Sequence, residues 1–159
     1  MAQPKIAAAH RILFLYAEPF AALYGALLVA RAPLKYLYLV HPAAPAHYHP
    51  SLQVVLDQLA ATYFLFAFNQ AVVLRVAGDG PGGLRVWTAM ICGMLLCDLL
   101  HINAAGNALG WGFLLHPAGW RFEEWMVMVP TYGFAAARVA FLLGFGVATE
   151  EARPKIKTG

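Results

Sequence analysis

Four ionisable side chains interrupt long apolar stretches of this 159-residue chain: Glu18, Asp57, Asp98 and Arg138. Charged groups at membrane depth are costly, and they usually face a polar interior and carry function. An arginine stays charged and holds a nearby carboxylate ionised, whereas a second desolvated carboxylate beside the first tends to keep its proton. The set therefore predicts an acid–base site, in which a base activates water or a hydroxyl and an acid protonates an oxygen or an alkene.

The expected roles follow from position along the chain. We expect Asp98 to be the base, Asp57 the acid or partner carboxylate, and Arg138 the residue that sets their charge. The two aspartates could exchange roles, and Glu18 is an alternative acid. His101 follows Asp98 by three residues, so the two share a helix face and His101 could orient the base. Further side chains are expected to contact the substrate, namely Gln58, Tyr63, Asn69, Asn103 and Tyr132.

Purely structural explanations remain open for each of these residues. Glu18 and Arg138 could neutralise each other between the first and last apolar segments. Asp57 could be an interfacial residue, and His101 could be a neutral histidine that donates to Asp98. The amide side chains could simply join helices by hydrogen bonds. The occurrence of ionisable groups in all four apolar segments favours the functional interpretation.

The composition indicates that a membrane surrounds these residues. Apolar residues make up 61% of the chain and charged residues only 12%, whereas soluble domains contain about 25% charged residues. Such a surface cannot face water, which argues against a soluble enzyme and a disordered chain. The net charge of +3 forms no basic stripe, so no nucleic-acid partner is expected. The expected partners are a lipophilic small molecule and membrane lipid.

The apolar stretches are each long enough to cross a bilayer as a helix. They are expected at about residues 10–31, 52–75, 84–104 and 125–148, within a single domain of residues 1–159. This pattern predicts an all-α fold, a transmembrane four-helix bundle. The longer connections, at about 32–51 and 105–124, contain tryptophans and tyrosines typical of the membrane interface and could cover the bundle mouth.

The distribution of basic residues predicts the orientation. Seven lysines and arginines lie on the side of the two termini and three on the opposite side, which places both termini in the cytosol. The chain ends in KIKTG, and Lys155 and Lys157 resemble the dilysine retrieval signal of endoplasmic-reticulum membrane proteins. That signal must face the cytosol, in agreement with the charge count. We therefore expect an integral membrane protein of the endoplasmic reticulum.

Few other ligands or partners are expected. The pair Cys92 and Cys97 and the pair His47 and His49 lack the spacing of metal ligands, so neither a metal nor another cofactor is expected. Small residues in the last span, such as those at 135–137, could support helix contacts within one chain or in a homo-oligomer.

The run FLYAEPFAALYGALLVARAP, followed by YLYLVHP and LDQLAATYFLFAFNQAVVLR, resembles a group of small fungal four-span membrane proteins. Several of these belong to secondary-metabolite gene clusters, and some resemble the epoxide hydrolases or cyclases of the citreoviridin and aurovertin type. The resemblance covers about residues 10–148. It implies opening of a polyketide-derived epoxide by water or an internal hydroxyl, and we expect the substrate to be an apolar polyketide or terpenoid. It carries over no catalytic residue.

Other resemblances leave alternatives open. Two carboxylates with an arginine are similar in logic to the Asp-Arg-Asp set of limonene-type soluble epoxide hydrolases, which have an unrelated fold. A looser likeness exists to sterol-isomerase-type proteins of the endoplasmic reticulum, and fungal membrane terpene cyclases perform related chemistry in larger chains. The non-enzymatic alternative is a lipid- or sterol-binding protein, which needs a cavity but no paired ionisable groups.

Overall fold

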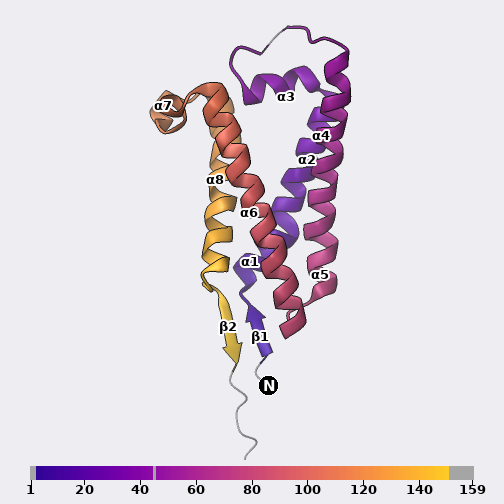
Figure 1. Ribbon diagram of the computed structural model, residues 1–159, viewed down its shortest axis with the longest axis vertical. Coiled ribbons are helices and arrows are strands. Elements are labelled where there is room, and N and C mark those ends of the chain that lie inside the picture. Colours follow the sequence, from indigo (N-terminus) through magenta and orange to yellow (C-terminus); the bar gives the residue numbers. More distant parts are fainter. Residues whose placement is uncertain (1–2, 45, 151–159) are drawn as a thin grey trace, which may run out of the picture.

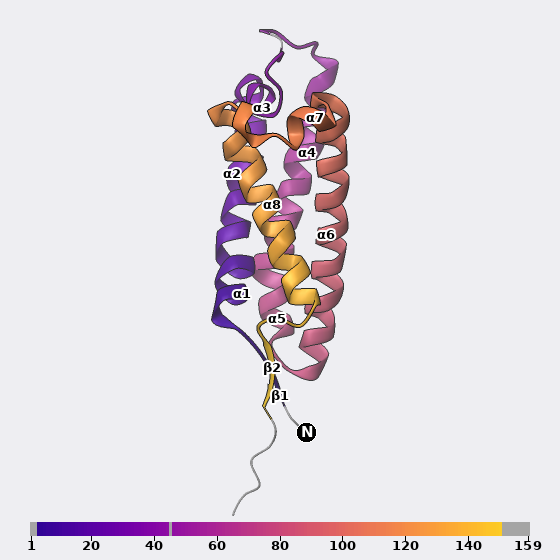
Figure 2. The same cartoon turned by 90° about the vertical axis from the view of Figure 1, so that its left-hand side faces the viewer.

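Four helical segments form the body of the molecule (Figure 1). The computed structural model describes residues 3–44 and 46–150, so the predicted signal at Lys155 and Lys157 lies outside the described residues. The segments long and apolar enough to cross a membrane are Ala8–Arg31, Ser51–Ala77, Pro81–Leu109 and Phe122–Leu142. They run side by side (Figure 2), which confirms the expected all-α bundle.

The first span contains a wide turn near its middle. Its consecutive parts are α1 (Ala8–Ile12), the π-helical η1 (Leu13–Ala17) and α2 (Glu18–Arg31). In an α-helix the N–H of residue 19 would donate to the carbonyl of Leu15. Pro19 has no N–H, so this hydrogen bond cannot form. Arg75 of the second span donates to that carbonyl instead, at 3.0 Å, and its guanidinium lies over the Tyr16 ring. The first two spans are thus joined where the first departs from α-helical geometry.

The second span has a matching irregularity. Its consecutive parts are α4 (Ser51–Phe68), the π-helical η2 (Asn69–Val73) and α5 (Leu74–Ala77). The turns η1 and η2 pack against each other in the bundle. A π-helical turn holds more residues than an α-helical turn and so shifts the faces that follow it, and such turns are frequent at functional sites.

The third and fourth spans pack against each other as α6 (Pro81–Leu109) and α8 (Phe122–Leu142). Helix α6 extends past the expected end near residue 104 because the first break is Gly110, whose φ of +91° favours glycine. The connection holds the short α7 (Trp111–Leu114) and the 3₁₀ turn η3 (Pro117–Gly119).

The fourth span ends earlier than expected, at Leu142 rather than near residue 148. Gly144 and Gly146 have φ of +87° and +75°, and they turn the chain out of the helix. The strand β2 (Val147–Glu150) then pairs antiparallel with β1 (Gln3–Ile6). This sheet joins the segment before the first span to the segment after the last span, at one end of the bundle (Figure 1).

The buried apolar side chains form two clusters. The cluster at the sheet end draws on all four spans and consists of Ile6, Phe14, Leu15, Leu74, Trp87, Ile91 and Phe141. The cluster at the other end is centred on Val29, Leu56 and Ala60 and lies between α2, α4 and the short helix α3 (Pro33–Val40). In Figure 1, α6 and α8 diverge from α2 and α4 toward α3. The bundle is therefore closed by packing at the sheet end and splayed at the α3 end.

Residue Arg121 connects the two sides at the splayed end. Its guanidinium lies 4.7 Å over the ring of Tyr38 and donates to the Tyr38 carbonyl at 3.2 Å. The same guanidinium forms an ion pair with Glu124 in the first turn of α8. The start of α8 is thereby attached to α3.

Candidate functional site

The largest group of buried charges joins three spans. Arg138 of α8 forms an ion pair with Glu18 of α2 through Nη2 and with Asp98 of α6 through Nη1. The side chains of Arg138 and Glu18 are 2% and 9% exposed, whereas that of Asp98 is 18% exposed. We call these three residues the ion cluster. Asp98 is its most accessible member.

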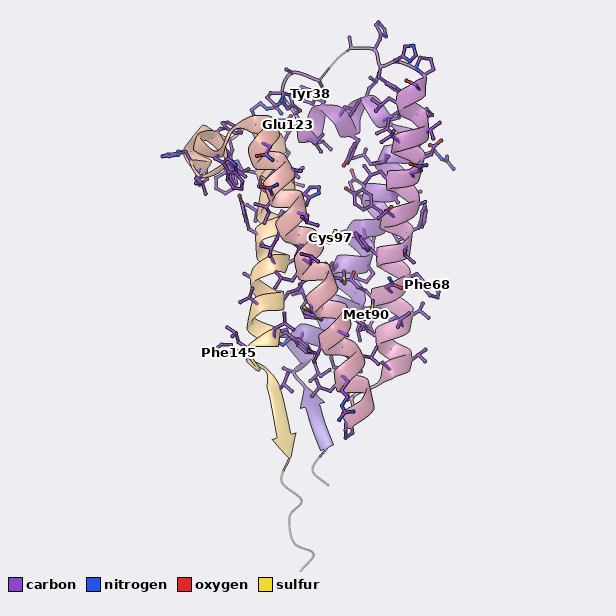
Figure 3. The ribbon with its side chains drawn as sticks, in the orientation of Figure 1. Tyr38, Phe68, Met90, Cys97, Glu123 and Phe145 are labelled. Atoms are coloured by element: carbon purple, nitrogen blue, oxygen red, sulfur yellow. The ribbon has the colours of Figure 1, made fainter. Side chains whose placement is uncertain are left out.

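The ion cluster lies at mid-depth in the bundle. Glu18 follows the start of α1 at Ala8 by ten residues, which corresponds to about 15 Å along a helix, or half of a hydrocarbon core about 30 Å thick. Figure 3 shows Cys97, the neighbour of Asp98 in sequence, about midway between Glu123 near the α3 end and Phe145 near the sheet end. A lipophilic molecule in the hydrocarbon core of the membrane could therefore reach the depth of these charges.

Charge balance restricts the protonation of the ion cluster. One guanidinium faces two carboxyl groups, so the cluster is neutral only when one carboxyl carries a proton. A net charge in a dry, apolar bundle carries a large desolvation penalty. The neutral cluster holds one carboxylate and one carboxylic acid, which are the two partners that acid–base catalysis requires.

Asp57 does not join the ion cluster, so the expectation that it shares a site with Asp98 and Arg138 is wrong. Its side chain is exposed and accepts a hydrogen bond from Gln53 at 2.7 Å. The physical reason is the helix face: the neighbouring positions Leu56 and Ala60 point into the second apolar cluster, and Asp57 is turned away from them. Glu18, the expected alternative acid, occupies the position next to Arg138.

The other expected polar residues lie around the bundle rather than in the ion cluster. Gln58, His101 and Asn103 are exposed, and Asn69 is half-buried. The described residues include no hydrogen bond between His101 and Asp98, so the expected orientation of Asp98 by His101 is not found. The described residues also include no interhelical hydrogen bond from the side chains of Gln58, Asn69 or Asn103.

Each of the two tyrosines expected to contact a substrate contacts another aromatic residue of the chain. Tyr132 of α8 is half-buried and stacks on Trp120, with ring centroids 6.3 Å apart. The Tyr63 hydroxyl lies 3.1 Å from that of Tyr36 on α3, and either hydroxyl can donate. Burial raises the pKa of Tyr36 above the ordinary phenol value. Tyr63 therefore joins α4 to α3.

One buried polar residue escaped the sequence analysis. Gln70 in η2 is 0% exposed, and neither amide atom has a hydrogen-bond partner among the described residues. A signal was present in the sequence: the buried positions of the second span follow one another at intervals of three, four or seven residues. These positions are Leu56, Ala60, Ala67, Gln70 and Leu74. That spacing identifies the inward face of the helix.

The chain belongs to the family described as "Domain of unknown function (DUF7704)", whose profile matches residues 4–148. Comparisons with the curated proteins and with the solved structures gave no match. Among the residues that the structure describes, no group of three or more histidine, cysteine, aspartate or glutamate side chains is placed to hold a metal ion.

Proposed function

We propose that the protein is a membrane-embedded acid–base enzyme that opens an epoxide in an apolar polyketide or terpenoid metabolite, by hydrolysis or by attack of an internal hydroxyl. The observation that carries the proposal is the ion cluster, in which one buried arginine holds two carboxyl groups from two other spans. A bundle stabilised only by packing needs no such group, since buried ion pairs often add little stability. The resemblance to small fungal four-span membrane proteins, some of which resemble epoxide hydrolases or cyclases, supports the same reaction.

The burial of the two carboxyl groups supports a division of roles. Glu18 is the deeper one, and its Oε2 has no hydrogen-bond partner among the described residues, so we assign it as the acid. Asp98 is the more accessible one and is assigned as the base. Arg138 contacts both, so its charge balances whichever carboxyl group is ionised when Asp98 gains a proton and Glu18 gives one up.

The reaction balances with these three residues. Asp98 takes a proton from water as the water oxygen forms a bond to an epoxide carbon. The C–O bond of the epoxide breaks, and its electron pair goes to the epoxide oxygen, which takes the proton of Glu18. The product is a diol, or a cyclic ether with a new hydroxyl when an internal hydroxyl attacks. Transfer of the proton from Asp98 to Glu18, directly or through water, restores the starting state.

We also propose a location in the endoplasmic reticulum, with a substrate that reaches the site from the lipid phase. The mid-depth position of the ion cluster suits a lipophilic substrate, and the sequence KIKTG resembles the retrieval signal of membrane proteins in that compartment. The same acid and base would serve a sterol-isomerase-like or terpene-cyclase-like reaction, in which the acid protonates an alkene. A lipid- or sterol-binding protein would use the ion cluster only as a link between spans.

An activity assay on matched carboxylate variants separates these possibilities. The full chain in lipid nanodiscs is incubated with 1,2-epoxyhexadecane or squalene 2,3-epoxide in H₂¹⁸O, and labelled diol is measured by mass spectrometry. We expect Asp98→Asn and Glu18→Gln each to lower turnover by about 100-fold or more. The control Asp57→Asn removes an exposed carboxylate from the neighbouring span and should leave turnover unchanged. Wild-type protein without activity on any epoxide, or Asp98→Asn at wild-type rate, would contradict the proposal.

A further inference from the structure

Gln70 is the buried polar residue that the reaction above leaves without a role. Its side chain is fully buried in η2, and its Nε2 and Oε1 lack hydrogen-bond partners among the described residues. Buried amides are almost always hydrogen-bonded, because an unpaired donor or acceptor in an apolar interior is destabilising. A glutamine at such a position is therefore expected to bind a polar atom that reaches it from outside the chain.

The register of the first two spans places Gln70 beside Glu18. At Gly25 the backbone of α2 lies against Tyr63 of α4, since a Cβ added there would be 3.4 Å from the Tyr63 ring. Glu18 precedes Gly25 by seven residues and Gln70 follows Tyr63 by seven. Seven residues are about two helical turns, which return to the same face. In this antiparallel pair, both steps lead toward the sheet end, so Glu18 and Gln70 reach the same level on facing sides.

Two further observations agree with this placement. Glu18 begins α2 directly after η1, Gln70 lies within η2, and the two wide turns pack against each other. The free Oε2 of Glu18 and the Nε of Arg138 are also buried without partners among the described residues. The N–H groups of Gln70 and of the Arg138 Nε are thus unpaired donors close to Glu18, the residue assigned as the acid.

We infer that Gln70 and the free oxygen of Glu18 form the subsite for the substrate's oxygen atom, an inference that rests on the proposed function. The Gln70 Nε2 donates a hydrogen bond to the epoxide oxygen, and Glu18 protonates the same oxygen when the C–O bond breaks. Negative charge develops on that oxygen in the transition state, and a preoriented N–H in a dry site stabilises it. Gln70 is on this basis a catalytic residue for the oxygen that leaves carbon.

The test uses two unreactive ligands of the same shape, one with an ether oxygen and one without. The ligands are 2-dodecyltetrahydrofuran and dodecylcyclopentane, and their affinities for the full chain in detergent are measured from the ligand-dependent rise in unfolding temperature. Gln70→Met removes the amide while keeping an unbranched side chain of similar size. The matched control is Gln53→Met, which changes a glutamine at the far end of the same span, where it contacts Tyr48 and Asp57. Turnover of 1,2-epoxyhexadecane by the same proteins is measured in parallel.

We expect wild-type protein and Gln53→Met to bind the ether at least about tenfold more tightly than the carbocycle, which corresponds to a single hydrogen bond of about 1.4 kcal/mol. Gln70→Met should lose most of this preference, because only the Glu18 hydroxyl is then left to donate to the ether oxygen, and it should turn over the epoxide about 100-fold more slowly. If Gln70→Met does not fold, Gln70→Asn takes its place, with a shorter amide that should lose most of the ether preference.

The outcomes separate this inference from the proposed function. Wild-type protein without an ether preference, or a Gln70 variant that keeps it, overturns the oxygen subsite. A Gln70 variant that hydrolyses the epoxide at the wild-type rate also overturns it and leaves the proposed function standing. An ether preference that depends on Gln70, in a protein inactive on every epoxide, supports the subsite and removes the epoxide reaction.

Discussion

At the scale of single residues, the arginine decides whether the interior tolerates its two carboxyl groups. Arg138 is 2% exposed and pairs with Glu18 and Asp98. Each partner alone would be a buried acid with no compensating charge. The three residues of the ion cluster are therefore energetically coupled. The effects of single substitutions on the free energy of unfolding should not add, and the coupling is measured by comparing single variants with combined ones.

Removal of the arginine should be far more harmful than removal of all three charges. We expect Arg138→Met to lower the free energy of unfolding by about 3–5 kcal/mol, because it leaves two carboxyl groups unpaired in the interior. The triple variant Glu18→Gln, Asp98→Asn, Arg138→Met should recover most of that loss while remaining inactive. Thermal unfolding in detergent checks both. Equal stability of wild-type protein and Arg138→Met would show that the arginine has no such role.

A second prediction concerns the tyrosine pair at the α3 end. Burial raises the pKa of Tyr36, whereas in the unfolded chain the phenol ionises near pH 10. The folded state then binds its proton more tightly, so stability is full below about pH 10 and falls as the pH rises above it. The unfolding temperature of wild-type protein should fall more steeply between pH 9.5 and 11 than that of Tyr36→Phe. Parallel pH profiles for the two proteins would contradict this assignment.

The sequence predicts which residues are candidates for the site better than it predicts whether their side chains face the interior of the bundle. Glu18, Asp98 and Arg138 stand out because each is a charge within an apolar run, and the structure brings these three together. Asp57 has the same signal but lies beside the inward face rather than on it. Gln70 carries no charge, and only the spacing of the buried positions in its span indicates that it faces the interior. A residue's face depends on packing between helices, which one span does not reveal.

At the scale of elements, the four spans follow from hydropathy, but their ends and wide turns do not. Helix ends depend on local backbone features, such as the positive φ of Gly110 and Gly144. The turns η1 and η2 depend on tertiary contacts as well, since the Arg75 donor compensates for the N–H that Pro19 lacks. Hydropathy over a window of residues averages out both effects.

The tight connection between the second and third spans provides a prediction for an element. A Cβ on Gly83 would lie 2.3 Å from the carbonyl oxygens of Ala77 and Gly78, whereas one on Gly82 would meet nothing within 4 Å. Gly83→Ala should therefore lower the free energy of unfolding by about 1–3 kcal/mol, and Gly82→Ala should change it little. Thermal unfolding of the two variants provides the comparison. A Gly83→Ala protein as stable as Gly82→Ala would show that the connection relaxes freely.

At the scale of the whole molecule, the splayed bundle has one tightly packed end and one bridged end. Aromatic packing among Phe14, Trp87 and Phe141 closes the sheet end, with ring centroids 6.0 to 6.4 Å apart. At the other end, α3 and Arg121 bridge the two helix pairs. A substrate that enters from lipid would then approach the ion cluster from the α3 side, where Asp98 is the accessible carboxyl group.

At this scale we predict the orientation of the bundle in the membrane. The antiparallel pairing of β1 with β2 places both ends of the described chain on one side, and the excess of lysine and arginine on that side predicts that it is cytosolic. In microsomes, an N-glycosylation site in a flexible insert between α3 and α4 should therefore be glycosylated, and the same insert at either terminus should not. Glycosylation at a terminus with none between α3 and α4 would reverse the orientation.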